Sequence, residues 1–116
     1  MSSISGHDVY PGGAVYCASK FAIDALTKGL RADLLGKDIR VTAISPGLVE
    51  TEFSLVRYQG DAERANKIYQ GIQSLTSEDV ADAVIYCATC PPHVNVSEII
   101  LTPVAQATVL LTHRAQ

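Results

Sequence analysis

The sequence predicts an α/β fold with parallel strands. Apolar residues recur at helical spacing over residues 14–35, and two β-prone runs stand at 40–45 and 98–102. Further helical stretches lie between those two runs, so the order is helix, strand, helices, strand. Strands that alternate with helices typically pair in parallel. With 116 residues, 47% of them hydrophobic, the chain has the size of one domain.

The first third of the chain combines turn signals with one long helix. Residues 1–13 are expected to end a strand and continue as a loop, because Pro11-Gly12-Gly13 interrupts any regular element. Small and apolar residues then follow a helical period to about Leu35, and Gly36 is a plausible helix stop. The run 40–45 suits a buried parallel strand that ends at Pro46-Gly47.

The remaining elements are predicted from caps and breakers. An irregular helical segment is expected up to residue 60, followed by a helix over 61–70 with Asp61 as its cap. Thr76 and Asp79 have the spacing of a capping box, which predicts a helix that reaches about residue 89. The run 98–102 is the last strand. The tail, with apolar residues at 109–111, is expected to be loosely held.

Composition excludes several classes of function. The net charge of −3 provides no basic surface for nucleic acid. No apolar run approaches the ~20 residues of a membrane span. The first residues lack the charged and apolar regions of a secretory signal. We therefore expect a cytoplasmic protein with no nucleic-acid or membrane partner.

Three cysteines, Cys17, Cys87 and Cys90, form no disulfide framework and favour reduced thiols. Cys87 and Cys90 have the spacing of a C-x-x-C pair, but no second pair of ligands accompanies them. Buried or helix-end thiols are therefore favoured over a redox or zinc site. No metal site is expected, since His7, His93 and His113 have no ligand spacing.

A tyrosine and a lysine in the long helix carry the clearest chemical signal. Tyr16 and Lys20 are four residues apart, so they share one face of a helix. A cation beside a phenol favours the phenolate form, and such a pair suits proton transfer near neutral pH. Ser3 lies thirteen residues before Tyr16, with Ser2 and Ser5 as neighbouring alternatives. Each residue alone has an ordinary structural explanation, and the combined spacing favours a catalytic one.

Together these residues resemble a known family. Ser3, Tyr16 and Lys20 are similar to the Ser…Tyr-x-x-x-Lys signature of the short-chain dehydrogenases/reductases, and the segment Pro46–Thr51 is similar to their Pro-Gly-x-x-x-Thr segment. The runs PGLVETEFSLVRYQGD and LTSEDVADAVIYCATCPPHVNV resemble the subgroup of NADP-dependent 3-hydroxy acid (serine or L-allo-threonine) dehydrogenases.

The resemblance implies a partial Rossmann-like fold, the C-terminal portion of a doubly wound parallel sheet with about two core strands and three to four helices. None of the eight glycines gives the family's Gly-x-x-x-Gly-x-Gly spacing after a strand. We therefore expect residues 1–116 to form a single partial domain, a C-terminal half that lacks the N-terminal dinucleotide-binding half. Because two-stranded sheets are marginal in water, such a chain is expected to be unstable alone or to self-associate.

The resemblance also implies roles for individual residues. Tyr16 would be the general acid/base, Lys20 would tune it and hold the nicotinamide ribose, and Ser3 would position the substrate oxygen. Pro46, Gly47, the backbone around Val49 and the Thr51 hydroxyl would hold the nicotinamide carboxamide.

The expected function is hydride transfer between NADP(H), favoured over NAD, and a small 3-hydroxy acid or β-hydroxy amino acid or its carbonyl form. Arg57 lies in the segment that covers substrate in the family and could bind a carboxylate through two parallel hydrogen bonds. A surface arginine explains it equally well. The expected partners are a second copy of the chain or full-length subunits. The alternative is a truncated, inactive fragment that acts as a subunit-interaction module, and a thiol sensor through Cys87 and Cys90 is the weakest hypothesis.

Overall fold

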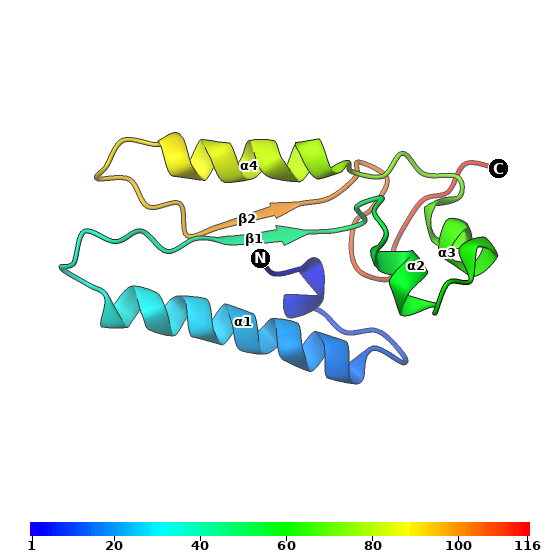
Figure 1. Ribbon diagram of the computed structural model, residues 1–116, viewed down its shortest axis with the longest axis horizontal. Helices are drawn as coiled ribbons and strands as arrows, with labels where there is room; N and C mark the ends of the chain where they lie inside the picture. The colour runs from blue at the N-terminus through cyan, green and yellow to red at the C-terminus, as the bar shows by residue number, and fades with distance from the viewer.

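The computed structural model describes residues 1–116 and has the expected α/β arrangement. The strands β1 (Ala43–Pro46) and β2 (Glu98–Leu101) pair in parallel, with Ala43 opposite Glu98. Helix α4 (Ser77–Thr89) lies on one side of the two strands, and α1 (Ala14–Asp33) lies on the other (Figure 1). The single-turn 3-10 helix η1 (Ile4–Gly6) lies between α1 and the strands.

The two short helices α2 (Phe53–Arg57) and α3 (Ala62–Tyr69) gather beyond the carboxyl ends of both strands (Figure 1). The predicted caps are confirmed there and in α4. The Asp61 side chain accepts from the backbone N–H of Arg64 at 3.0 Å. The Thr76 hydroxyl accepts from the Asp79 N–H at 3.2 Å, and the Asp79 carboxylate accepts from the Thr76 N–H at 2.7 Å. These bonds to Thr76 hold the pKa of the Asp79 carboxyl below its usual value.

Helix and strand boundaries follow the prediction to within a few residues. Helix α1 begins at Ala14 and ends at Asp33, and Gly36 takes a positive φ of 82° in the turn that follows. Strand β1 begins at Ala43 rather than at residue 40, because the Val41 N–H is taken by the Asn95 side chain. The strand end expected within residues 1–13 is wrong, because the structure has no strand there and forms instead the turn η1, which was not predicted.

The expectation of a loosely held tail is wrong. The Arg114 guanidinium donates to the carbonyls of Ile68 and Gln70 at 2.8 and 2.7 Å. The Ala115 N–H donates to the Gly71 carbonyl at 2.8 Å. Carbonyls at the end of a helix lack partners within it, so the end of α3 supplies acceptors that fix the tail.

The interior is small for a chain of this length. The radius of gyration is 15.7 Å, whereas a compact domain of this size has about 13 Å. Large apolar side chains remain exposed on α1, among them Val15 at 85% and Leu26 at 56%. This surface agrees with an unstable or self-associating chain, which stays a prediction. None of the helices has the length and apolar character needed to cross a membrane.

Candidate functional site

A pocket of about 560 Å³ opens beyond the carboxyl end of β1. Its walls come from the segment around η1, the start of α1, the loop that follows β1, the helices α2, α3 and α4, and the tail. In open α/β sheets, ligands bind at this edge, and the volume is that of a small-molecule site.

Most residues predicted from the sequence to be catalytic or cofactor-binding line this pocket. They are Ser3, Tyr16, Pro46, Gly47, Val49 and Thr51. Lys20 is the exception, because it lies beside Tyr16 without lining the pocket. Segments up to 48 residues apart in the sequence therefore meet in one place.

Ser3 is the N-cap of η1, and its hydroxyl oxygen accepts from the Ser5 N–H at 3.1 Å. That bond uses the oxygen as an acceptor and leaves the hydroxyl hydrogen free to donate. The N–H of Ser2 donates to the Ile44 carbonyl at 2.7 Å, so the start of the chain is tied to β1. Ser2 and Ser5, the alternatives to Ser3, are each only 5% exposed. Ser3 is the most accessible of the three to a ligand.

Tyr16 and Lys20 lie on the same side of α1. The Lys20 ammonium is 5.7 Å from the centroid of the Tyr16 ring, and the Phe53 ring packs on Tyr16 with centroids 5.8 Å apart. Lys20 takes part in none of the ion pairs or side-chain hydrogen bonds of the chain, so its charge is available to a ligand.

Gly6 lets η1 approach α1 closely. A Cβ at Gly6 would lie 3.0 Å from the Lys20 carbonyl oxygen, which is tighter than ordinary contact. Glycine at this position therefore lets the turn that carries Ser3 pack directly on the helix that carries Tyr16 and Lys20, whereas a larger residue would push the two apart. With this close packing, Ser3 and Tyr16 both line the pocket and Lys20 lies beside the Tyr16 ring.

The loop after β1 presents free backbone groups to the pocket. The Leu48 N–H donates to the side-chain oxygen of Gln106 at 2.8 Å, and the carbonyl of Leu48 accepts from Leu75. The N–H and carbonyl of Val49 make no hydrogen bond within the chain. The Thr51 hydroxyl oxygen accepts from the Phe53 N–H at 3.2 Å and keeps its hydrogen for a ligand.

Gln106 and Tyr10 also line the pocket and were missed by sequence reasoning, because neither belongs to a recognisable spacing pattern. Gln106 lies after the last strand, is 5% exposed and fixes the loop at Leu48. Arg57, which the sequence left open, lines the pocket at the end of α2.

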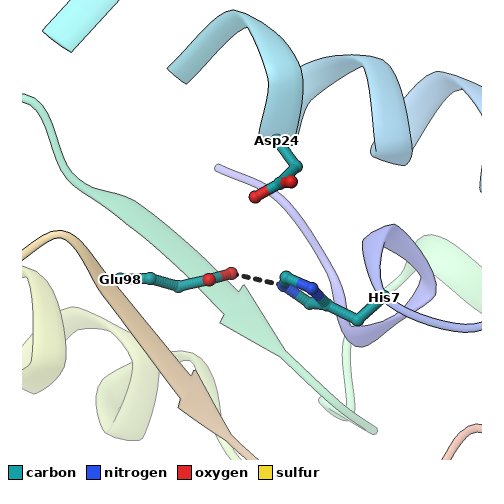
Figure 2. A group of neighbouring side chains, drawn as sticks. All are labelled: His7, Asp24 and Glu98. Atoms are coloured by element: carbon teal, nitrogen blue, oxygen red, sulfur yellow. Dashed lines mark hydrogen bonds and ion pairs between the residues drawn. The ribbon is translucent and has the colours of Figure 1, made fainter. Parts of the chain in front are cut away.

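A second group of titratable side chains lies outside the pocket. Figure 2 shows His7, Asp24 and Glu98, whose ligand atoms lie within 4.8 Å of one another. His7 is bonded to the Glu98 carboxylate, which also accepts from the buried Ser45 hydroxyl at 2.7 Å. Asp24 pairs with Lys28 at 2.9 Å.

Sequence spacing could not reveal this group, because the three residues come from a loop, a helix and a strand. The arrangement could hold a cation. Each of the three side chains already has a protein partner, however. The evident effect of the group is to connect His7, just after η1, to the two strands.

A ligand pocket at the carboxyl end of a parallel sheet, lined by a serine, a tyrosine and a Pro-Gly turn, is the arrangement of a Rossmann-like α/β protein. A family profile described as short chain dehydrogenase matches residues 1–62. The chain belongs to the short-chain dehydrogenase family, as the sequence resemblance implied.

Individual relatives agree with this assignment. The chain is 46% identical over 107 residues to a sulfoacetaldehyde reductase of Chromohalobacter salexigens, covering 92% of this chain and 42% of the relative. It is 36% identical over 116 residues to an NADP-dependent 3-hydroxy acid dehydrogenase of Schizosaccharomyces pombe. That match covers 100% of this chain and 45% of the relative.

A solved structure of serine dehydrogenase in its closed form with NADP+ superposes with a TM-score of 0.91 at 44% identity. The match covers 99% of this chain and 47% of that one. The partial Rossmann-like fold is thereby confirmed. The chain spans less than half the length of the curated relatives it matches.

Proposed function

We propose that this chain carries the substrate and nicotinamide side of an NADP-dependent oxidoreductase that acts on a 3-hydroxy acid or β-hydroxy amino acid. The observation that carries the proposal is the pocket in which Ser3, Tyr16 and the turn after β1 meet, with the Lys20 ammonium 5.7 Å from the Tyr16 ring. The similarity to serine dehydrogenase with NADP+ and to a 3-hydroxy acid dehydrogenase supports the choice of substrate and cofactor.

The free polar groups of the pocket fit a nicotinamide. A carboxamide offers one acceptor and two N–H donors. The unpaired N–H and carbonyl of Val49 and the free hydrogen of Thr51 complement these groups. Bound NADP supplies or accepts the hydride. In this proposal residues 1–116 form one half of a domain, and the pyrophosphate is held outside it, since none of the eight glycines gives the phosphate-binding spacing.

The remaining steps belong to side chains of the pocket. The Ser3 hydroxyl donates to the substrate oxygen and fixes its position. In the oxidation direction, the Tyr16 phenolate takes the hydroxyl proton of the substrate as the hydride leaves carbon, and in reduction the phenol returns that proton to the carbonyl oxygen. The Lys20 ammonium lies beside the Tyr16 ring and is free to donate to the hydroxyls of a ribose.

Replacing the phenol tests this proposal directly. We expect Tyr16→Phe to lower the rate of NADPH formation from L-serine or 3-hydroxypropanoate by about 10²–10⁴-fold, the usual contribution of a general acid/base. Tyr86→Phe is the matched control, because Tyr86 lies on α4, is 59% exposed and does not line the pocket. An unchanged rate in Tyr16→Phe would exclude the assigned role. A wild-type chain that binds NADPH without hydride transfer would exclude catalysis by this chain alone.

The exposed surface of α1 favours a second candidate function, a module that binds copies of itself or full-length subunits. Val15, Phe21, Leu26 and Leu30 are at least 41% exposed on one helix. Apolar surface of this extent on a soluble chain marks an association site. In this alternative the chain contributes binding rather than chemistry, and the absence of hydride transfer with retained self-association would favour it.

A further inference from the structure

We infer that the pocket selects substrates that carry an anionic group, a carboxylate or a sulfonate, and that Arg57 is the residue that recognises this group. The inference deepens the proposed function, because it uses the same pocket and names the feature that a substrate must have. It assigns Arg57 to substrate specificity and leaves proton transfer with Tyr16.

The charge of the pocket is the first observation. Of the 22 residues that line it, 12 are hydrophobic, and Arg57 is the only one with a charged side chain. An anion that enters apolar surroundings without a partner loses several kcal/mol of hydration free energy. The Arg57 side chain lines this pocket while remaining exposed. Its guanidinium therefore favours an anionic ligand over a neutral ligand of the same shape, and it disfavours a cation.

The orientation of the guanidinium is the second observation. The Arg57 guanidinium carbon lies 5.4 Å from the centroid of the Tyr10 ring and 5.7 Å from that of Tyr58. A guanidinium stacked on aromatic faces keeps its N–H donors directed outward from its edge. Two of these donors can bind the oxygens of a carboxylate or sulfonate in parallel.

Tyr10 is itself fixed by a glycine. A Cβ at Gly13 would come within 2.4 Å of the Tyr10 ring, so the ring packs directly on the Gly13 backbone. Any larger residue at position 13 would displace the ring. The position of the Tyr10 ring, on which the Arg57 guanidinium stacks, is thus limited by the turn that begins α1.

The donors of Arg57 are also available. No ion pair and no hydrogen bond within the chain involves its side chain. By contrast, Arg31, Arg40 and Arg114 all donate to backbone carbonyls. Arg64 stacks on Tyr58 at 4.3 Å without lining the pocket, so it provides a matched control for the loss of a nearby charge.

Helix α2 connects Arg57 to the proposed reacting centre. Phe53, whose ring packs on Tyr16, begins α2, and Arg57 ends it four residues later. Residues four apart lie on one helix face about 6 Å apart along the axis. Arg57 therefore lies on the same short helix that packs on Tyr16, so the proposed anion-binding group belongs to the element next to the proposed reacting centre.

Binding of small anions to the chain tests the inference without requiring catalysis. We would titrate the 15N-labelled chain with 3-hydroxypropanoate, 2-hydroxyethanesulfonate and neutral 1,3-propanediol and follow the Val49 and Thr51 amide signals. Wild type should bind at least one of the acids more tightly than the diol. Arg57→Gln should weaken binding of that acid at least about tenfold, the effect of losing a charged hydrogen-bond partner. Arg57→Lys should retain part of the affinity, and Arg64→Gln should keep all of it.

Three results would overturn the inference: no binding of either acid by wild type, equal affinity for acids and diol, or unchanged acid affinity in Arg57→Gln. The acid that is bound identifies the anion as carboxylate, sulfonate or both. These outcomes are independent of hydride transfer. If Tyr16→Phe leaves turnover unchanged while Arg57→Gln loses acid binding, the catalytic proposal fails and the specificity of the pocket stands.

Discussion

Substitution of Gly47 by alanine should destabilise the loop that forms the floor of the pocket. A Cβ at Gly47 would lie 2.3 Å from the side-chain oxygen of Gln106 and 3.0 Å from a methyl carbon of Thr102. Gln106 is 5% exposed and cannot move into solvent without leaving its site. Alanine therefore forces this amide away from the Leu48 N–H, to which it is bonded at 2.8 Å.

The expected cost follows from that lost contact. Leaving a half-buried N–H without a partner destabilises a fold by about 1–3 kcal/mol. For a chain of this length, each kcal/mol lowers the melting temperature by about 4 °C. Gly47→Ala should then lower it by about 4–12 °C. Gly29→Ala is a control that should raise the melting temperature. A Cβ added at Gly29 in α1 has no atom within 4 Å, and alanine in place of glycine stabilises a helix by about 0.5–1 kcal/mol.

A double-mutant cycle separates the clash from general damage. Gln106→Ala removes both the clashing oxygen and the bond to Leu48, so Gly47→Ala should cost much less in that background than in wild type. Thermal melts followed by circular dichroism at a fixed chain concentration measure all four variants. An equal cost of Gly47→Ala in both backgrounds, or a rise in melting temperature like that of Gly29→Ala, would refute the explanation.

Three further predictions concern pH, thiols and association. Because the Asp79 pKa in the folded chain lies below 3.8, its capping contribution is present above that pH and is lost as the pH falls through the folded value. Asp79→Ala should therefore melt lower than wild type near neutral pH, with a gap that closes in strongly acidic buffer; a constant gap would count against this. Burial raises the pKa of the Cys87 thiol above 9.0, so a thiol reagent followed by mass spectrometry should label Cys90 before Cys87, and the reverse order would contradict the described burial. Sedimentation velocity should show self-association that Leu26→Glu reduces, whereas a monodisperse wild-type monomer with a cooperative melt would exclude it.

Local patterns in the sequence were sufficient to predict the elements and part of the site. Tyr16 and Lys20 share a face because four residues separate them on a helix. The capping box at Thr76 and Asp79 involves residues three apart, so its hydrogen bonds depend only on local geometry. Features of this kind are visible in any single sequence.

Contacts between distant segments could not be predicted in the same way. Gln106 reaches Leu48 across 58 residues, and His7 reaches Glu98 across 91. Neither pair has a local pattern, since their meeting depends on how the helices pack on the strands. The tail was misjudged for the same reason, because the partners of Arg114 are carbonyls at the end of α3 rather than neighbours in sequence.

The bond from the Ser2 N–H to the Ile44 carbonyl has a practical consequence for handling this protein. It places the first residues at the open side of β1, where a strand edge offers further unpaired donors and acceptors. A purification tag fused ahead of Met1 would be guided along that edge and could pair with it. The oligomeric state of the chain should therefore be measured on protein from which such a tag has been cleaved.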